Sequence, residues 1–374
     1  MYVVAAPDKF KGSLDAPAVA RAIARGVRRV DPGARVDLVP LADGGDGTIA
    51  SLVTTVGGRV ERVRVHGPLG APVDAPLALL SDGRVVVEMA AASGLALLDG
   101  ALDALAATSR GTGELLRAAL ERRGAHPGAV VVAVGGSAST DGGAGAASAL
   151  GWRFLDRLGQ ELAPGGGALA SLARVDGERA VRIAPGAVVA ACDVDNPLLG
   201  PRGAARTFGP QKGAGDADVA RLEAGLQRLA EVVARDVGID VRALPHGGAG
   251  GGIGAGLVAF AGARLDGGFE LVSGAAGLER AVAGADLVVT GEGRLDAGTL
   301  GGKVAAGVAR VARAAGVPCV AVAGTVALGR DALAGAGIAA AAGLVEHVGE
   351  RQARDDPAGA VADVVERLVR GLPW

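Results

Sequence analysis

The sequence is poor in aromatic residues, cysteines and long apolar runs. Aromatic side chains are 2% of the 374 residues, so a core must be built from Val, Leu and Ala, and the stacking of bases on aromatic side chains is not expected. Two cysteines, Cys192 and Cys319, are too few for a disulfide framework and fit a reducing compartment. No apolar run approaches the roughly 20 residues of a membrane helix, and the N-terminus lacks the cationic start of a signal peptide. With a net charge of −2, we expect a cytoplasmic protein that binds neither nucleic acid nor membranes.

Lysine, histidine and asparagine are also scarce. Of the 38 basic residues only four are Lys, and Asn196 is the single Asn. In a chain that supplies most of its cations as Arg, each Lys marks a place where a compact ammonium group is needed. These lysines are Lys9, Lys11, Lys212 and Lys303. The four His residues lie outside the Gly-rich and acidic motifs, which argues against a zinc site or a Ser-His-Asp triad.

Glycine, in contrast, is abundant, and one Gly-rich loop stands out. Residues 130–134 are an apolar run typical of a strand buried on both faces of a parallel sheet. The Gly-rich loop of residues 135–143 follows and contains Gly135, Gly136, Ser137, Ser139 and Asp141, and then an Ala-rich helical segment begins. A strand, a Gly-rich loop and a helix together place backbone N–H groups around an anion such as a phosphate. The alternative is a plain turn in which Asp141 caps the helix.

The order of elements predicts an α/β protein of two domains. Strands and helices alternate at both ends of the chain, which indicates a mostly parallel, Rossmann-like sheet, and the first helix is expected at residues 16–30 with Ser13 as its N-cap. Between residues 59 and 89 the period switches towards two, which indicates an antiparallel excursion. We therefore expect a discontinuous Rossmann-like domain (1–65 plus 285–374) and an inserted mixed α/β domain (66–284). The strand at Val130 could instead belong to the first sheet.

Polar motifs are expected to follow the carboxyl ends of several strands. They lie at residues 7–13, 42–48, 135–141 and 290–296. Open α/β sheets bind ligands at that edge, so we expect one shared site. Carboxylates, lysines, hydroxyls and Gly loops are the groups that phosphoryl transfer needs, which indicates a small-molecule kinase or another phosphate-handling enzyme.

Seven long blocks, in order along nearly the whole chain, resemble the bacterial type I glycerate kinase family. They are 6–13 (APDKFKGS), 42–48 (ADGGDGT), 108–115 (TSRGTGEL), 135–143 (GGSASTDGG), 192–198 (CDVDNPL), 208–213 (FGPQKG) and 290–296 (TGEGRLD). The resemblance implies phosphorylation of D-glycerate with ATP and Mg²⁺, in a two-domain enzyme with its active site in the cleft between the domains. It also implies 2-phosphoglycerate as the product, in a monomer or homodimer. The chain departs from the family pattern at Lys9 and at Ser139-Thr140, so Lys9 and Thr140 receive no role.

Residue types then suggest roles within this hypothesis. Arg110, whose planar fork suits a carboxylate, is expected to bind the substrate with Lys11 and Asn196. Gly135, Gly136, Ser137 and Ser139 are expected to hold phosphate, and Lys212 or Lys303 to neutralise the transferred phosphoryl group. Asp193 is the expected general base, with Asp141 as its rival. Asp43, Asp46, Glu292 and Asp296 are expected to hold Mg²⁺, although Asp43 and Asp46 could simply favour a helix start.

Three alternatives stay open from the sequence. The product could be 3-phosphoglycerate. The chain could be a sensor that binds a small hydroxy acid without catalysis, although such a protein has no use for so many carboxylates and lysines. A nucleotide-sugar or dinucleotide oxidoreductase would need G-x-G-x-x-G directly after the first strand, and residues 7–13 do not provide it.

Overall fold

The computed structural model describes residues 1–301 and 303–372, which form two compact units, each with its own sheet. Unit 1 comprises Met1–Asp43, Ala50–Gly57 and Phe269–Trp374, and unit 2 comprises Gly44–Ile49 and Gly58–Gly268. These units are not divided at the expected limits of 65/66 and 284/285. Strand β3 (Gly58–His66) belongs to the sheet of unit 2, and helices α9 (Gly268–Ala276, from Phe269 onwards) and α10 (Leu278–Val282) belong to unit 1.

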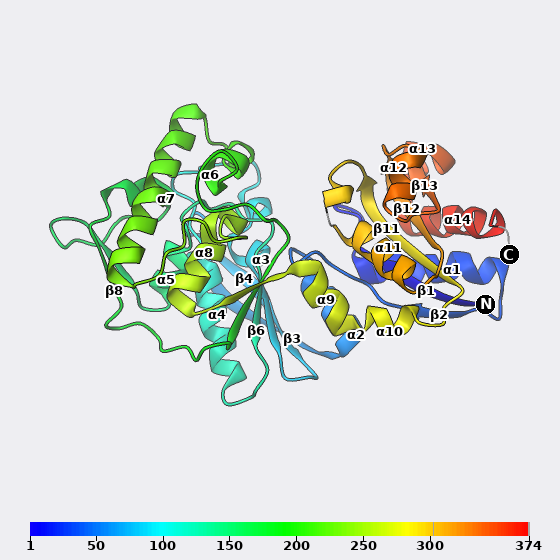
Figure 1. Ribbon diagram of the computed structural model, residues 1–374, viewed down its shortest axis with the longest axis horizontal. Helices are drawn as coiled ribbons and strands as arrows, with labels where there is room; N and C mark the ends of the chain where they lie inside the picture. The colour runs from blue at the N-terminus through cyan, green and yellow to red at the C-terminus, as the bar shows by residue number, and fades with distance from the viewer. Residues whose placement is uncertain (302, 373–374) are drawn as a thin grey trace. The chain divides into compact units, whose positions relative to one another are not determined.

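Unit 1 is a five-stranded parallel sheet in the order β13-β12-β11-β1-β2, as the alternation of elements predicted (Figure 1). Its strands are β1 (Tyr2–Pro7), β2 (Arg35–Leu38), β11 (Leu287–Leu295), β12 (Cys319–Val326) and β13 (Ala340–Gly343). Its helices are α1 (Ala16–Val30), α9 (Gly268–Ala276), α10 (Leu278–Val282), α11 (Val304–Ala314), α12 (Arg330–Gly335), α13 (Leu344–Asp355) and α14 (Pro357–Arg370), and α2 (Thr48–Val56) also lies largely in it. A 3₁₀ turn spans Thr299–Gly301.

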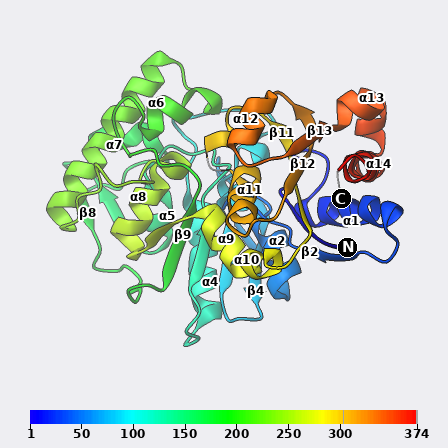
Figure 2. The ribbon, with the colours of Figure 1, turned by 45° about the vertical axis from the view of Figure 1, so that its right-hand side comes forward.

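Helix α1 has the predicted bounds, but its N-cap is Asp15. The Asp15 side chain accepts a hydrogen bond from the Ala18 backbone N–H at 2.7 Å, whereas Ser13 donates to the Phe10 carbonyl. Helices α1 and α14 lie side by side in both views (Figures 1 and 2), and they share an apolar cluster with one face of the sheet. Burial of each fully buried Val or Leu side chain in that cluster stabilises the folded protein by about 1.5–3 kcal/mol.

The connections in unit 1 reverse direction between β1 and β11. From β1 the chain passes through α1 to β2 on one side, and from β11 it passes through α11 to β12 on the other side. In open α/β sheets such a switch point leaves a crevice at the carboxyl ends of the two strands. The loop after β1 and the end of β11 therefore form the expected ligand-binding edge of unit 1.

Unit 2 holds a six-stranded sheet in the order β10-β9-β6-β5-β4-β3. Its strands are β3 (Gly58–His66), β4 (Pro72–Leu80), β5 (Val85–Glu88), β6 (Val130–Ala133), β9 (Val188–Cys192) and β10 (Arg264–Gly267). The pairs β3–β4 and β4–β5 are antiparallel, which confirms the predicted excursion, and the other pairs are parallel. The strand at Val130 thus belongs to this second sheet. A separate hairpin pairs β7 (Arg153–Leu155) with β8 (Arg174–Asp176).

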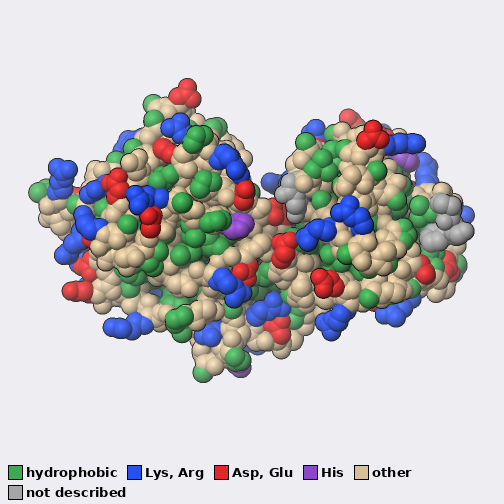
Figure 3. All heavy atoms as spheres, viewed as in Figure 1, with side chains coloured by type: hydrophobic (Ala, Val, Ile, Leu, Met, Phe, Trp, Pro, Cys, Tyr) green, Lys and Arg blue, Asp and Glu red, His purple; other side chains and the backbone are tan. Residues whose placement is uncertain are grey.

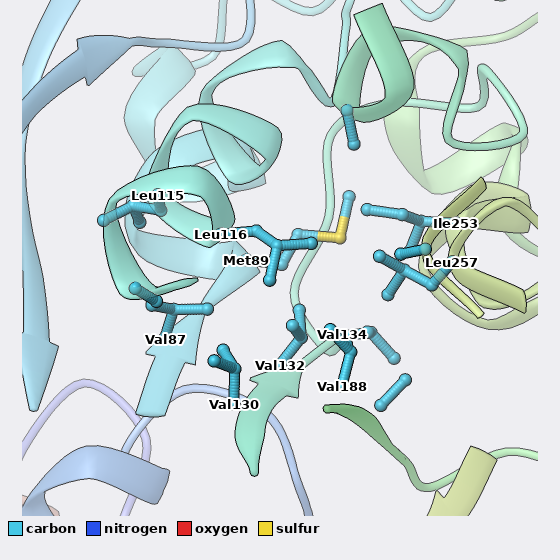
Figure 4. Close-up of a cluster of buried hydrophobic side chains, with 14 of the residues drawn as sticks. Val87, Met89, Leu115, Leu116, Val130, Val132, Val134, Val188, Ile253 and Leu257 are labelled. Atoms are coloured by element: carbon cyan, nitrogen blue, oxygen red, sulfur yellow. The ribbon is translucent and has the colours of Figure 1, made fainter. Parts of the chain in front are cut away.

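Six helices belong to unit 2: α3 (Met89–Ser93), α4 (Arg110–Arg123), α5 (Ala144–Ala149), α6 (Ala204–Phe208), α7 (Asp216–Asp236) and α8 (Ala249–Ala261), with 3₁₀ turns at Leu95–Leu98, Gly166–Ser171 and Pro210–Lys212. Figure 4 shows how side chains of α4 and α8 meet those of β5, β6 and β9 around Met89. This core is almost entirely aliphatic, as the composition required. It anchors the strands whose carboxyl ends carry the polar residues of the candidate site.

Two further observations concern the molecule's surface and helices. On the face drawn in Figure 3, basic and acidic side chains are interspersed on each unit, in line with the small net charge of −2. Within residues 1–301 and 303–372 no helix has the length and apolar character needed to cross a membrane.

Candidate active site

The Gly-rich loop after β6 and the acidic segment after β9 start from neighbouring strands. Strands β6 and β9 pair in parallel, with Ala133 opposite Ala191, and the Val134 N–H donates to the Ala191 carbonyl at 3.2 Å. Neighbouring strands lie about 4.8 Å apart. The exposed carboxylate of Asp193 and the loop at Gly135 therefore leave the same edge of the sheet.

The segment Gly44–Ile49 packs on this edge and brings Asp46 to it. A Cβ on Gly44 would lie 2.8 Å from the Gly268 Cα, and one on Gly135 would lie 2.7 Å from the Gly45 Cα. At Gly44 the backbone also has φ +87°, which favours glycine. The Ile49 N–H donates to the Glu88 carboxylate at the end of β5, at 2.7 Å. Unit 2 thus brings to one edge three features with predicted roles: Asp46 for the metal, the Gly-rich loop for phosphate and Asp193 for the base.

Only the first part of the Gly-rich loop reaches the surface. Gly136 is exposed and Gly135 is half-buried, whereas Ser139 and Thr140 are fully enclosed and their hydroxyls have no hydrogen-bond partner in the described structure. Ser137 lies between these two parts, with 7% of its surface exposed. Of the predicted phosphate-binding residues in this loop, Gly136 is exposed, Gly135 is half-buried, Ser137 is nearly enclosed beside them, and Ser139 is enclosed.

Asp141 binds the loop to the start of α4. Its carboxylate accepts hydrogen bonds from the Ser109 N–H at 2.8 Å, the Ser109 hydroxyl at 2.9 Å and the Thr108 hydroxyl at 3.2 Å. It also accepts from the Gly143 and Gly145 N–H groups, at 3.1 and 3.2 Å. A carboxylate that is 1% exposed and holds so many donors has its lone pairs engaged in structure. These contacts favour Asp193 over Asp141 as the base.

Lys212 is buried beneath the same loop. Its ammonium donates to the Ser137 hydroxyl oxygen at 2.8 Å and to the Ser139 carbonyl, and the residue is 1% exposed. Burial lowers the pKa of Lys212 to about 7, and the nearby Asp141 carboxylate opposes this shift. The ammonium therefore does not itself meet solvent, which was not foreseen from the sequence.

Arg110 and Asn196 also have partners within unit 2. Arg110 opens α4, and its Nε donates to the Glu114 carboxylate at 3.0 Å. Glu114 in turn accepts from the His66 N–H at 2.8 Å. The Asn196 amide nitrogen donates to the Arg202 carbonyl at 2.7 Å, which ties down the segment after β9.

Unit 1 gathers carboxylates at its switch point. Asp8 follows β1 directly, and its N–H donates to the Gly291 carbonyl at 2.8 Å. Burial raises the pKa of Asp8 to about 7, Lys9 lowers it, and the carboxylates of Asp43 and Glu292 raise it further. Asp8 was not among the predicted site residues, although its place at the end of the first strand could have indicated it.

Glu292 is the centre of the predicted residues in unit 1. Burial raises the pKa of Glu292, the Thr299 hydroxyl at 2.6 Å and Lys303 lower it, and Asp296 and Asp43 raise it. The motif 290–296 lies mostly inside β11 and not after it, because the pairing with β12 continues to Leu295. Asp296 is also ion-paired with Arg294, at 3.3 Å.

A pocket of about 390 Å³ lies beside these residues in unit 1. Lys11 and Gly293 line it with Thr325 of β12 and with Glu350 and Arg354 of α13. Neither Lys11 nor Arg354 has an ion-pair partner within the described residues, so the pocket offers two available cations. Thr325 and Arg354 were not predicted, because nothing local in the sequence distinguishes them.

The carboxylates do not form a ready-made metal cage. Within residues 1–301 and 303–372, no three Asp, Glu, His or Cys side chains are arranged to hold a metal ion together. Asp43, Glu292 and Asp296 lie in unit 1, and Asp46 lies in unit 2.

Comparisons with known proteins agree on one family. Residues 3–372 match the model of the glycerate kinase family. The chain is 44% identical over 349 residues to the glycerate kinase of Halalkalibacterium halodurans, covering 92% of this chain and 91% of that protein. It is 44% identical over 328 residues to the glycerate 2-kinase of Escherichia coli, covering 87% and 85%.

A solved structure gives the same result for the fold. The crystal structure assigned as a glycerate kinase 2 from Salmonella typhimurium LT2 superimposes with a TM-score of 0.85 at 41% identity, over 99% of this chain and 97% of that one. The α/β fold and the resemblance found in the sequence are thereby confirmed. The chain belongs to the glycerate kinase family and is therefore a kinase.

Proposed function

We propose that this enzyme phosphorylates the 2-hydroxyl of D-glycerate with ATP and releases 2-phosphoglycerate and ADP. The similarity to a glycerate 2-kinase supports the choice of hydroxyl. The observation that carries the proposal is the exposed residue Asp193, which directly follows β9, the strand paired with the one that precedes the Gly-rich loop. This arrangement supports the assignment of a proton acceptor and of a phosphate-binding loop to the same edge of the sheet.

Asp193 acts as the general base in this proposal. Its carboxylate takes the proton of the substrate hydroxyl as the hydroxyl oxygen forms a bond to the γ-phosphorus of ATP. The bond between that phosphorus and the bridging oxygen breaks, and ADP leaves with the bond's electron pair. The backbone at Gly135 and Gly136, with the Ser137 hydroxyl, supports the negative charge of the phosphoryl oxygens.

The carboxylates of unit 1 are suited to Mg²⁺, even without a preformed cage. Mg²⁺ keeps several waters and is commonly held by one or two carboxylates together with substrate phosphates. The raised pKa of Asp8 and of Glu292 reflects burial with other carboxylates nearby, an imbalance that a cation relieves. We assign Asp43, Glu292 and Asp296 to this ion, with Asp8 added, and keep Asp46 as a candidate in unit 2. An ion bound there would neutralise negative charge on the phosphates of the nucleotide.

Arg110 and Lys11 remain candidates for anion binding. Among residues 1–301 and 303–372, Arg110 is hydrogen-bonded through its side chain only at Nε, to Glu114, so both terminal nitrogens are available to a carboxylate. Lys11 lines the pocket of unit 1 without an ion-pair partner in the described part of the chain. Lys303, which lies in the field of Glu292, is assigned to the phosphates of the nucleotide. The side-chain nitrogen of Asn196 holds its own loop through the Arg202 carbonyl, so we assign Asn196 no direct contact with the substrate.

A coupled assay of ADP release with ATP, Mg²⁺ and D-glycerate tests the activity. We expect turnover that depends on D-glycerate, and phosphorus NMR of the product should show a phosphate ester at C2. A signal of 3-phosphoglycerate would overturn the choice of hydroxyl. Binding of D-glycerate without ADP release would instead support a non-catalytic sensor. Light scattering of the same sample should show a monomer or homodimer.

A further inference from the structure

We propose that Lys212 is a positioning residue that makes the Ser137 hydroxyl a hydrogen-bond donor to the transferred phosphoryl group. The inference rests on the proposed function and assigns Lys212 a role that residue type alone did not indicate. A direct contact between the ammonium and the phosphoryl group was expected, but the burial of Lys212 favours action through Ser137.

The hydrogen bond between Lys212 and Ser137 has a fixed direction. A lysine ammonium has three donors and no acceptor, so in its contact with Ser137 the hydroxyl oxygen must accept. The serine has one proton, which is then left to be donated elsewhere. Within residues 1–301 and 303–372 the Ser137 hydroxyl has no second hydrogen-bond partner. The proton is therefore available to a ligand.

Exposure differs along the loop. Ser137 is 7% exposed and follows the exposed Gly136, whereas Lys212 is 1% exposed and Ser139 is completely buried. A ligand on the loop therefore meets Ser137 before it meets the ammonium. The positive charge of Lys212 thus acts on the ligand through the polarised Ser137 O–H group.

The ammonium of Lys212 is closely surrounded. It also donates to the Ser139 carbonyl, and a Cβ on Gly251 would lie 2.9 Å from it. Gly251 has φ +76°, a backbone conformation that favours glycine, and because it has no side chain, α8 can approach the loop closely. The lysine has little room to turn away from Ser137, so the direction of the hydrogen bond is set before any ligand binds.

Loss of the lysine's proton would remove the constraint on this hydrogen bond. A neutral amine has a lone pair as well as two N–H donors, so the Ser137 proton would gain a competing acceptor on the inner side and the ligand would lose its assured donor. Burial lowers the pKa of Lys212 to about 7, and Asp141, on the loop packed against it, is the charged side chain of the described residues that opposes the shift. Activity that depends on Ser137 should therefore decline as the pH rises above this pKa.

The test compares Ser137→Ala, Lys212→Met and the double variant in the ADP-release assay between pH 6 and 9. We expect each single variant to lower kcat by about 10²-fold, as loss of a transition-state donor does. The double variant should be no slower than the slower single variant, because the two residues act as one unit. The alkaline decline of the wild-type protein should be absent in Ser137→Ala, and comparison of the two removes the titration of ATP itself.

The matched control for Ser137→Ala is Ser148→Ala. This substitution removes an exposed hydroxyl on α5 that donates to the Ala144 carbonyl, and the variant should keep the wild-type kcat. If Lys212→Met does not fold, Ser137→Ala and its pH profile decide alone. An unchanged kcat in Ser137→Ala, a persisting alkaline decline or additive losses would overturn the proposal. A wild-type protein that never releases ADP would instead refute the proposed function, and this inference with it.

Discussion

At the scale of single residues, the environment of each acidic side chain separates structural from chemical roles. Asp141 and Asp193 follow neighbouring strands of one sheet. Asp141 lies in the Gly-rich loop and Asp193 in the acidic segment after β9, so the sequence offered both as the base. Asp141 is enclosed by donors from α4 and from its own loop, whereas Asp193 is exposed. A base must meet the substrate hydroxyl, so the exposed carboxylate is the better candidate.

The first prediction concerns Asp193→Asn. Loss of a positioned base commonly costs about 10²–10⁴-fold in rate, so kcat should fall within that range while KM for D-glycerate changes little. Asp195→Asn is the matched control, because Asp195 is exposed two residues further on and is ion-paired with Arg202 at 2.6 Å. Steady-state kinetics of both variants provide the check, and a near-normal kcat in Asp193→Asn would exclude it as the base.

The second prediction concerns the stability of Lys212→Met as a function of pH. The pKa of Lys212 is about 7 in the folded protein, against about 10.4 in the unfolded chain. Between these values the unfolded chain binds one proton more, so the wild-type free energy of unfolding gains about 1.36 kcal/mol per pH unit from this group as pH rises. Below pH 7 both states carry the proton, so the folded protein bears the full free-energy cost of the buried charge and this contribution no longer changes with pH.

Lys212→Met, which cannot titrate, lacks this gain. Its stability relative to the wild-type protein should therefore be highest near pH 6 and should decline towards pH 9.5. Urea denaturation at several pH values measures the difference. A difference that stays constant with pH would show that the buried lysine keeps an ordinary pKa.

At the scale of elements, close approach between helices depends on glycine. Gly26 lies in α1 where α14 crosses it, and a Cβ there would lie 2.5 Å from the Ala362 carbonyl oxygen and 2.9 Å from the Val365 Cβ. The pattern of apolar residues predicted α1 itself, but not the partner that makes Gly26 necessary.

The third prediction compares two helical Gly→Ala variants in unit 1. Gly26→Ala should lower the free energy of unfolding by about 1–3 kcal/mol, because α14 must move to accept the methyl group. Gly274→Ala in α9 has nothing within 4 Å of its new Cβ. It should raise stability, by up to about 1 kcal/mol, through helix propensity. Urea melts of the two variants should shift in opposite directions, and equal shifts would contradict the packing of α1 on α14.

At the scale of the whole molecule, two compact units each bring part of the predicted machinery to the carboxyl ends of parallel strands. Unit 1 carries the carboxylates around Glu292, and unit 2 carries the Gly-rich loop with Asp193. Ligands that bind the folded state alone stabilise it by mass action. Thermal unfolding therefore reports nucleotide and metal binding without any turnover.

The fourth prediction is a thermal shift that depends on the metal. ADP with Mg²⁺ at 100 times its Kd should add about 2.7 kcal/mol to stability, which corresponds to a rise in Tm of several degrees. An excess of EDTA should remove most of this rise, because the carboxylates of unit 1 repel a nucleotide whose charge is not neutralised. Differential scanning fluorimetry measures both. An equal rise in the presence of EDTA would contradict the assignment of a metal to Asp43, Glu292 and Asp296.

The sequence by itself determined the aliphatic core, the alternation that builds the two sheets, the antiparallel excursion and the family. These features depend on local periodicity and on contiguous motifs, which can be identified without knowing which distant residues pack against them. Only the tertiary structure decided that Asp141 is held by α4, that Ser139 and Lys212 are enclosed, and that Asp8 joins Asp43 and Glu292. The physical reason is that burial, the direction of a hydrogen bond and the field of a neighbouring carboxylate depend on residues distant in the chain, which packing alone brings together.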